Sequence, residues 1–246
     1  MKTGRTYVVL GASGGIGSAL CRRLAEEGAT VIAAARDQAK LQERLAGVPV
    51  VESILDPTRP EEIDRCLREA VEQHGPLGGA ANCVGSLLLK PAHLTTDEEW
   101  SRTLALNLTT CFHLLRAAVR SFPPEGGSIV LVASAAARVG LANHEAIAAA
   151  KGGVIGLCLA AAASYASRGI RVNCVAPGLT RTPLTARITG SEGSMRTTSA
   201  MHALGRIGEA EEVASGLAWL LDPEQGWVTG QVLGIDGGLA RVRPKS

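Results

Sequence analysis

The sequence predicts a single α/β domain of the doubly wound type, in which a parallel seven-stranded sheet carries helices on both faces. Short, continuous apolar runs alternate with longer segments of helical periodicity along the chain, which is typical of buried parallel strands joined by crossover helices. The first apolar run ends in a glycine-rich turn. The length of 246 residues suits one large domain, and a hydrophobic content of 46% is ordinary for a globular protein.

The first unit of the chain shows the pattern most clearly. Thr6–Leu10 is a short apolar run, and it leads through the glycine turn into an amphipathic segment, Ser18–Glu27. Gly28 ends this segment in the way a glycine commonly ends a helix, and the apolar run Thr30–Ala35 follows as the next strand.

The same alternation continues to the C-terminus. We expect strands at residues 6–10, 30–35, 49–54, 77–82, 128–133, 170–175 and 231–235. We expect helices at residues 18–27, 38–46, 60–73, 97–121, 144–167 and 209–221. The segment 183–208 is rich in Ser, Thr and Gly and has no clear period, which predicts a mobile flap or short helices over a pocket. Residues 1–246 thus form one domain in this prediction.

Charge and cysteine content argue against several classes of protein. A net charge of +2 gives no electrostatic footprint for nucleic acid or an anionic membrane. The longest apolar run, Gly152–Ala163, is too short to span a bilayer, and the N-terminus does not have the pattern of a signal peptide. The six cysteines lie in apolar segments without the spacing of metal ligands, so we expect buried thiols, no metal site and a cytoplasmic location.

The turn after the first strand has the sequence GASGGIG, from Gly11 to Gly17. Its glycines allow a ligand to approach the backbone, and a helix that begins near Gly15 directs its free N–H groups and positive dipole end toward the turn. A pyrophosphate fits such a site. The spacing differs from the GxGxxG pattern, so the turn alone also fits a strand-to-helix connection without a ligand. Its place after the first strand favours a dinucleotide.

Further motifs occur in an order typical of one family. A GxxxGxG turn follows the first strand, Asn-Cys-Val-Gly follows the fourth, Pro-Gly follows the sixth, and Asp-Gly-Gly follows the last. The residues concerned, with three candidate active-site residues, are Gly11, Gly15, Gly17, Asn82, Gly85, Asn107, Ser134, Lys151, Pro177, Gly178, Thr182 and Asp236. Over essentially its whole length the chain resembles the short-chain dehydrogenase/reductase family, close to its 3-oxoacyl-carrier-protein reductase branch.

The resemblance implies a Rossmann-type fold, a nicotinamide dinucleotide cofactor, and hydride transfer to or from a small carbonyl or hydroxyl compound. It implies that Ser134 polarises the carbonyl, that Asn107 holds a water molecule of the proton relay, and that Lys151 contacts the nicotinamide ribose. The cofactor-binding residues that it implies are Gly11, Ser13, Gly15, Ile16, Gly17, Arg36, Asp56, Asn82, Gly85, Lys151, Pro177, Gly178 and Thr182.

The end of the second strand indicates which dinucleotide binds. An NAD-specific site of this fold places a carboxylate there to accept from the ribose hydroxyls, whereas this chain has Ala35 followed by Arg36. A guanidinium suits the 2′-phosphate of NADP, so we predict NADP(H) over NAD(H); an Arg36–Asp37 pair is the competing interpretation. The resemblance assigns the adenine amino group to Asp56, but Pro57 lacks the backbone N–H that the family offers to the ring.

The general acid of the family is missing from its expected position. The family has a Tyr four residues before the Lys, and this chain has Ile147 four residues before Lys151, at the family's spacing from Ser134. Of the two tyrosines, Tyr7 lies in the first strand, and Tyr165 lies roughly 27 Å along the helix from Ile147. Removal of a general acid typically costs about 10²–10⁴-fold in rate.

Several proton donors remain open. His144 lies three residues before Ile147 and seven before Lys151, roughly on one helix face, and could donate directly or through water. We favour the alternative, in which His144 is a helix-start residue exposed to solvent or to a neighbouring subunit, because it lies one turn further from the hydride site. Ser134 acting with Lys151 through a water molecule is another donor.

Four further residues bear on the pocket. His93 and His202 lie in segments that could border it. Lys90 and Arg138 could contact an anionic substrate or simply be solvated.

Two functions compete. The first is an NADP(H)-dependent oxidoreductase with an altered proton donor, which the presence of Asn107, Ser134 and Lys151 favours. The second is a catalytically impaired NADP(H)-binding protein that serves as a sensor or partner subunit, which Ile147 favours. The resemblance also implies a homo-oligomer, a dimer or tetramer built on the helices expected at 97–121 and 144–167.

Overall fold

A seven-stranded parallel sheet forms the centre of the computed structural model, which describes residues 4–190 and 192–243. The strand order is β3-β2-β1-β4-β5-β6-β9. The strands are β1 (Thr6–Leu10), β2 (Thr30–Ala35), β3 (Val51–Ile54), β4 (Leu77–Asn82), β5 (Gly127–Val132), β6 (Ile170–Pro177) and β9 (Val232–Ile235). The predicted fold class, with its seven parallel strands, is confirmed.

The strand order reverses direction between β1 and β4. The chain builds outward from β1 to β3, then returns to the other side of β1 and continues to β9. The two strands are paired in parallel with Leu10 opposite Asn82, so their carboxyl ends lie side by side. A reversal of this kind opens a crevice at the carboxyl edge of the sheet, which is where α/β proteins bind their ligands.

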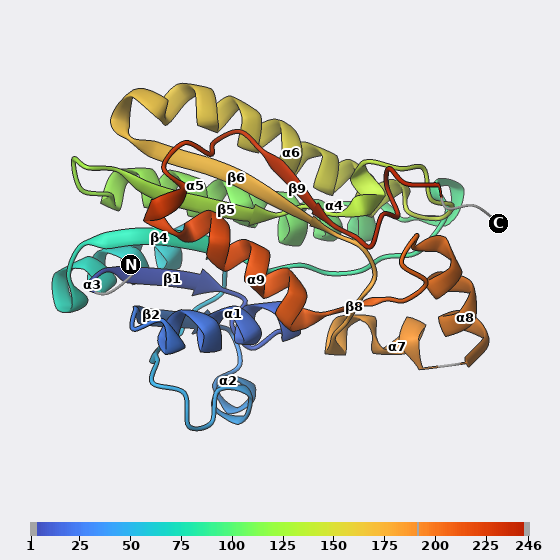
Figure 1. Cartoon of the computed structure of the whole chain (residues 1–246), viewed down its shortest axis with the longest axis horizontal. Coiled ribbons are helices and arrows are strands. Elements are labelled where there is room, and N and C mark those ends of the chain that lie inside the picture. The colour runs from blue at the N-terminus through green and yellow to red at the C-terminus, as the bar shows by residue number, and fades with distance from the viewer. Residues whose placement is uncertain (1–3, 191, 244–246) are drawn as a thin grey trace.

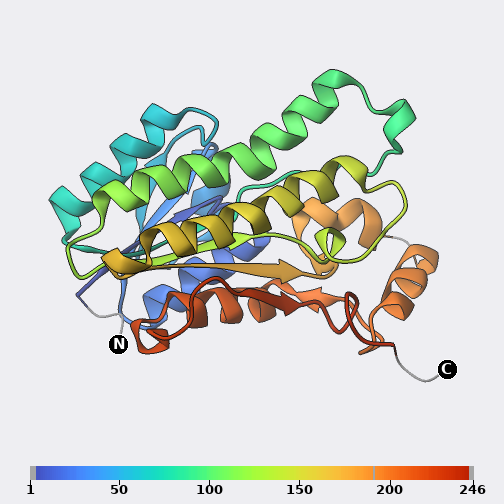
Figure 2. The same cartoon turned by 90° about the horizontal axis from the view of Figure 1, so that it is seen from above.

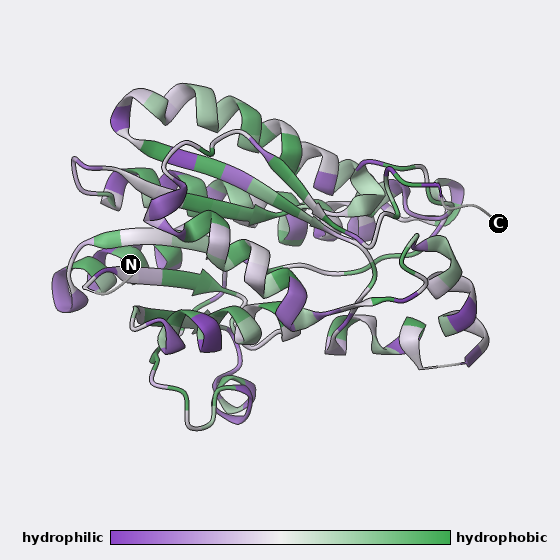
Figure 3. Ribbon diagram, in the orientation of Figure 1, coloured by the Kyte–Doolittle hydropathy of each residue, from purple (hydrophilic) through white to green (hydrophobic). Residues whose placement is uncertain are grey.

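Helices cover both faces of the sheet (Figures 1 and 2). Helices α3, α5 and α6 lie on one face, and α1 and α9 pack together on the other. Apolar side chains fill the space between the layers in two separate cores, and hydrophobic colours dominate the strands in Figure 3. The helices are α1 (Gly15–Glu26), α2 (Gln38–Arg44), α3 (Pro60–His74), α4 (Asp97–Leu104), α5 (Thr110–Ser121), α6 (Glu145–Tyr165) and α9 (Ala210–Leu221).

The helix expected at residues 97–121 is interrupted, which corrects that prediction. Helix α4 ends at Leu104, Ala105–Thr109 form a π-helical segment, and α5 continues from Thr110. An i→i+5 turn of this kind leaves the hydrophobic period of the sequence nearly unchanged, so the period alone does not reveal it. The other helices and strands differ from their predicted bounds by a few residues at their ends, as is usual for helix and strand termini.

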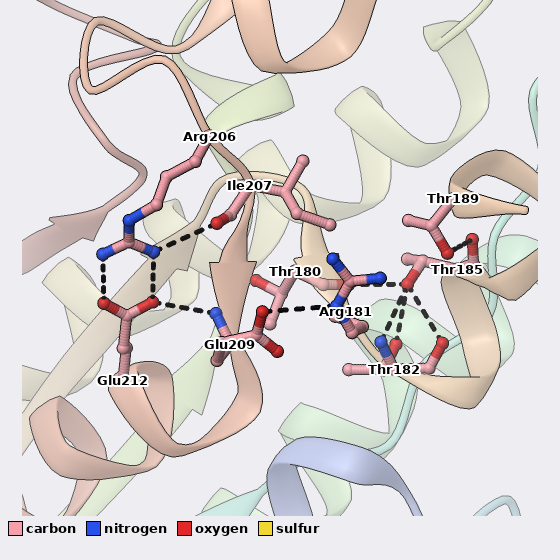
Figure 4. Close-up of polar contacts among 9 residues, drawn as sticks. All are labelled: Thr180, Arg181, Thr182, Thr185, Thr189, Arg206, Ile207, Glu209 and Glu212. Atoms are coloured by element: carbon pink, nitrogen blue, oxygen red, sulfur yellow. Dashed lines mark hydrogen bonds and ion pairs between the residues drawn. The ribbon is translucent and has the colours of Figure 1, made fainter. Parts of the chain in front are cut away.

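The segment between β6 and α9 forms the flap over the carboxyl edge of the sheet. It contains α7 (Ala186–Thr189), α8 (Glu192–Met201) and a small parallel sheet that was not predicted, made of β7 (Thr180–Arg181) and β8 (Gly208–Glu209). Arg206 grips the Glu212 carboxylate with both terminal nitrogens, at 2.6 and 2.8 Å, which holds the pKa of Glu212 down to about 2 (Figure 4). These contacts tie the return of the flap to α9.

The apolar stretch around helix α6 is longer than the predicted run Gly152–Ala163. With the turn that follows it, Glu145–Arg168 is long and apolar enough to cross a membrane by length and composition. Core helices of globular domains satisfy the same test, and α6 packs on β6 with Val154, Cys158 and Ala161 buried in the core. We therefore describe α6 as a core helix of this domain.

Candidate active site

The glycine turn between β1 and α1 is closely packed against the next strand connection. Gly11 has a φ of 78°, and a Cβ added to it would lie 2.8 Å from the carbonyl carbon of Cys83. A Cβ at Gly15 would lie 2.8 Å from the Thr182 methyl group of the flap, and Gly17 packs directly on the Gly11 carbonyl. Side chains at these positions would therefore fill the turn. The backbone remains open to a ligand at the N-terminus of α1, an arrangement that fits a dinucleotide pyrophosphate.

A cavity of about 210 Å³ continues from this turn toward the end of β2. Its walls include Gly11, Ser13 and the side chains of Arg36 and Lys40. Asp37 caps α2 by accepting from the Lys40 backbone N–H at 3.1 Å, and it pairs with the Lys40 ammonium at 3.4 Å. Arg36 is exposed and makes no hydrogen bond or ion pair with any residue that the structure describes. The pairing of Arg36 with Asp37 that we considered is therefore not observed.

The opposite wall of this cavity carries Pro57, which is buried. The neighbouring Asp56 carboxylate accepts from the Thr58 backbone N–H at 2.9 Å and from the Thr58 hydroxyl at 2.8 Å. The first of these bonds is the main reason that the pKa of Asp56 is lowered. One carboxylate oxygen of Asp56 is thus occupied by hydrogen bonds within its own turn. Lys40 also lines this cavity, and its place there was not predicted from the sequence.

The side chain of Asn82 stabilises the turn after β4 through buried hydrogen bonds. This side chain is fully buried, donates to the Thr110 hydroxyl at 3.1 Å and accepts from the Val84 backbone N–H at 2.9 Å. It therefore holds the turn against α5, and the cofactor contact that the resemblance implies for Asn82 stays a prediction. The turn then carries Cys83 and Gly85, which line the nucleotide cavity.

Asn107 lies in the π-helical segment between α4 and α5, and its side chain is fully engaged. It donates to the Ser86 hydroxyl at 2.9 Å and to the Thr103 carbonyl at 3.0 Å, and it accepts from the Ser86 backbone N–H at 3.2 Å. A Cβ at Gly85 would lie 3.0 Å from the Asn107 amide oxygen and 3.9 Å from Lys151 Nζ. Gly85, Asn107 and Lys151 therefore meet in one place. Ser86 is a residue of this network that sequence reasoning did not identify.

Lys151 is buried on α6 and points at the carboxyl end of β5. Its ammonium donates to the Val132 carbonyl at 2.7 Å. Burial in an apolar environment lowers the pKa of this amine, and the nearby thiols of Cys111 and Cys174 offset that effect only in part.

Ser134, His144 and Ile147 line a second cavity of about 300 Å³ at the same edge of the sheet. The Ser134 oxygen accepts from the Ala136 backbone N–H at 3.1 Å, and Ile147 is 4% exposed. His144 precedes the first turn of α6, and its Nδ1–H donates to the Ala142 carbonyl at 2.7 Å, which leaves Nε2 as the second ring nitrogen. His144 is half-buried at the start of α6 and lines the cavity, and its role as a proton donor stays a prediction.

The flap closes this cavity through His202, which is 3% exposed. The imidazole accepts through Nε2 from the Leu179 backbone N–H at 3.2 Å and donates through Nδ1 to the Thr198 carbonyl at 2.8 Å. Thr185 donates to the Thr180 carbonyl at 2.6 Å in the same segment (Figure 4). The Nε2 atom of His202 thus holds the flap at Leu179, directly after the Pro177–Gly178 turn, while Nδ1 bonds within the flap.

Other candidate residues lie outside the cavity. Lys90 forms an ion pair with Glu99 at 2.7 Å, and Arg138 donates to the Val232 carbonyl at 3.4 Å. His93 is exposed on a short turn before α4. Within residues 4–190 and 192–243, no three His, Cys, Asp or Glu side chains come together in a group that could hold a metal ion.

The fold and site together define a doubly wound α/β protein with two neighbouring cavities at the carboxyl edge of its sheet. A family model described as "Enoyl-(Acyl carrier protein) reductase" matches residues 11–240. The chain belongs to the short-chain dehydrogenase/reductase family of oxidoreductases, whose members bind NAD(P)(H).

Relatives with assigned names and solved structures are similar over the full chain. A 3-oxoacyl-[acyl-carrier-protein] reductase of Vibrio cholerae is 35% identical over 97% of this chain and 98% of its own length. A tropinone reductase homologue of Arabidopsis thaliana is 37% identical, covering 96% of this chain and 93% of that protein. A structure of a variant of actinorhodin polyketide ketoreductase with NADPH has a TM-score of 0.92 and 30% identity, covering 98% of this chain and 100% of that chain.

Proposed function

We propose that the protein is an NADP(H)-dependent oxidoreductase that interconverts a carbonyl and an alcohol with an atypical proton donor. One observation carries the proposal: Ser134 and His144 line the same cavity as Ile147, which stands where the family resemblance places the general acid. Neither tyrosine supplies that acid, since Tyr7 is buried in β1 and Tyr165 ends α6.

Arg36 and Lys40 support the preference for NADP(H). Both cations border the cavity at the end of β2, where Ala35 offers no carboxylate to a ribose. The Arg36 guanidinium forms no ion pair with the residues that the structure describes, and it can bind a 2′-phosphate with two hydrogen bonds.

Each protein group has a definite task in this proposal. Bound nicotinamide supplies or accepts the hydride. The Ser134 hydroxyl already accepts from Ala136 N–H, and it donates its own proton as a hydrogen bond to the substrate oxygen. The Ala142 carbonyl fixes Nδ1–H of His144, so the protonated ring delivers its proton from Nε2. The Val132 carbonyl holds the Lys151 amine beneath the crevice, where it can contact the nicotinamide ribose as the resemblance implies.

Substitution of Ile147 tests the proposal. Ile147→Tyr should raise the rate of NADPH-dependent ketone reduction by about 10²–10⁴-fold, because it supplies a general acid four residues before Lys151. His144→Ala should lower the wild-type rate by at least about tenfold. Ala149→Tyr is the matched control, since Ala149 is exposed on the same helix and does not line the cavity. Equal rates for Ile147→Tyr and Ala149→Tyr, or a fully active His144→Ala, would contradict the proposed roles.

The second candidate is a pseudoenzyme that binds NADP(H) as a sensor or partner subunit. The observation that favours it is the apolar wall that Ile147 gives to the cavity. NADPH binding without turnover, in both the wild type and Ile147→Tyr, would select this candidate.

We further propose a cytoplasmic homo-oligomer that acts on a small molecule. All six cysteines are free thiols, and five of them are buried, which suits a reducing compartment. Phe112 on α5 and Leu159 on α6 are 44% and 51% exposed, which suits burial between subunits. A single-subunit mass by light scattering at micromolar concentration would count against the oligomer.

A further inference from the structure

We propose that the cavity beside Ser134 accepts an uncharged, compact, largely apolar ketone or secondary alcohol, and that it discriminates against substrates with a carboxylate or phosphate. The inference rests on the proposed function and specifies its substrate class. It follows from the chemistry of the cavity wall, the state of its polar groups and the nature of its mouth.

The wall of the cavity contains no Asp, Glu, Lys or Arg among the residues that the structure describes. Leucine, isoleucine, methionine and alanine side chains make up most of it. The two cations that could have contacted an anionic substrate are committed elsewhere, because Lys90 pairs with Glu99 at 2.7 Å and Arg138 donates to the Val232 carbonyl. A carboxylate in this cavity would lose its hydration without gaining a permanent counter-charge, which is costly.

The polar groups of the wall leave little capacity for a polar substrate. His202 uses both ring nitrogens to hold the flap, and the Thr185 hydroxyl donates to the Thr180 carbonyl. Ser134 and His144 remain beside Ile147, where they can serve one oxygen atom, and Thr198 of the flap adds one further hydroxyl. A polyhydroxylated sugar would bury several hydroxyls without partners, which disfavours it.

The mouth of the cavity is also apolar. Leu89 and Met201 line the cavity while 41% and 45% exposed, so they offer apolar surface to an entering ligand. The volume of about 300 Å³ suits a small ring or branched chain and lies at the lower end of ligand pockets in general.

Two ketones of nearly the same shape test this inference. Para-isopropylacetophenone and para-acetylbenzoate differ mainly in the replacement of an isopropyl group by a carboxylate. Binding is measured by titration calorimetry on the full chain saturated with NADP⁺, because the oxidised cofactor cannot reduce a ketone. The neutral ketone should bind at least about tenfold more tightly. Equal or tighter binding of the carboxylate, or no binding of either, would overturn the inference.

A charge placed in the wall should reverse the preference. Ile188 of α7 lines the cavity, whereas Ala186 of the same helix is exposed outside it. Ile188→Lys should weaken binding of the neutral ketone and strengthen binding of the carboxylate ketone, each by about tenfold. Ala186→Lys should change neither affinity. Identical effects of the two variants would overturn the assignment of this cavity.

Turnover separates this inference from the proposed function. Selective binding of a neutral ketone that is never reduced with NADPH would support the proposed ligand class and contradict the proposed oxidoreductase activity. Reduction of the carboxylate ketone in preference to the neutral one would support the oxidoreductase activity and contradict the proposed substrate class.

Discussion

A single buried lysine connects stability with function in this protein. Lys151 lies under the crevice with its ammonium bonded to the Val132 carbonyl, and its burial lowers its pKa. Taking a charge from water into such a site costs free energy that a well-packed apolar side chain would not lose. A residue of this kind indicates a site at which stability is reduced for the sake of activity.

Replacement of Lys151 by methionine should therefore stabilise the protein while reducing activity. The pKa of Lys151 in the folded chain lies below the usual value of about 10.4. The wild type therefore carries its full penalty below the folded pKa and loses it as pH rises toward the unfolded value. In urea unfolding near pH 7, we expect Lys151→Met to raise the free energy of unfolding by about 1 kcal/mol or more. This difference from the wild type should shrink as pH rises.

Lys40→Met is the control for this measurement, because Lys40 is exposed at the start of α2. It should leave the pH dependence of unfolding above pH 7 unchanged, because its partner Asp37 titrates only in the acid range. A gain for Lys151→Met that grows with pH, or a loss of stability at neutral pH, would contradict this account of Lys151.

Residue positions were predicted from the sequence where a motif fixes them, and missed where only folding brings residues together. Ser134 and His144 were expected near Ile147, and all three line one cavity. Lys40 and Ser86 were missed, because neither belongs to a motif and each meets its partners through a turn. The burial of Asn82 beneath its turn was missed as well, since a motif does not tell which way a side chain faces.

The flap is the element that gives the cavity its outer wall. His202 follows the end of α8 and accepts a hydrogen bond from the Leu179 backbone N–H. We call this bond the pin, because it connects the flap to the end of β6. The position of His202 near the pocket was predicted from the sequence, whereas the hydrogen bonds of both ring nitrogens were not.

Loss of this pin should loosen the flap without unfolding the sheet. His202→Ala removes the partner of the Leu179 N–H and of the Thr198 carbonyl, a cost of about 1–3 kcal/mol for each buried group left unpaired. Hydrogen–deuterium exchange should accelerate in peptides covering α7 and α8 and remain unchanged in β1 and β4. His93→Ala, on an exposed turn, serves as control. Protection of the flap equal to that of the wild type would contradict the role of the pin.

The π-helical segment is the second element that the sequence did not reveal. It places Asn107 where its side chain reaches both Ser86 and Thr103, and a regular helix from 97 to 121 was expected there. The departure lies in the i→i+5 backbone hydrogen bonds of Ala105–Thr109, which the apolar pattern does not show.

At the scale of the whole molecule, the order of the strands explains why these elements meet. Parallel pairing of β1 with β4 and of β5 with β6 brings the glycine turn, the Gly85 turn and Ser134 to one edge of the sheet. Seven apolar runs with intervening helices were enough to predict this sheet, because buried parallel strands have a strong signal. The small β7–β8 sheet was not predicted, because its two-residue strands are too short to show a period.

Binding of the two dinucleotides tests the central claim of an NADP(H) site most directly. NADPH and NADH are titrated separately into the wild type and into Arg36→Ala, and binding is followed by fluorescence. The wild type should bind NADPH at least about tenfold more tightly than NADH, a difference of about 1.4 kcal/mol, and Arg36→Ala should bring the two affinities together. Tighter binding of NADH by the wild type, or no binding of either dinucleotide, would contradict the account.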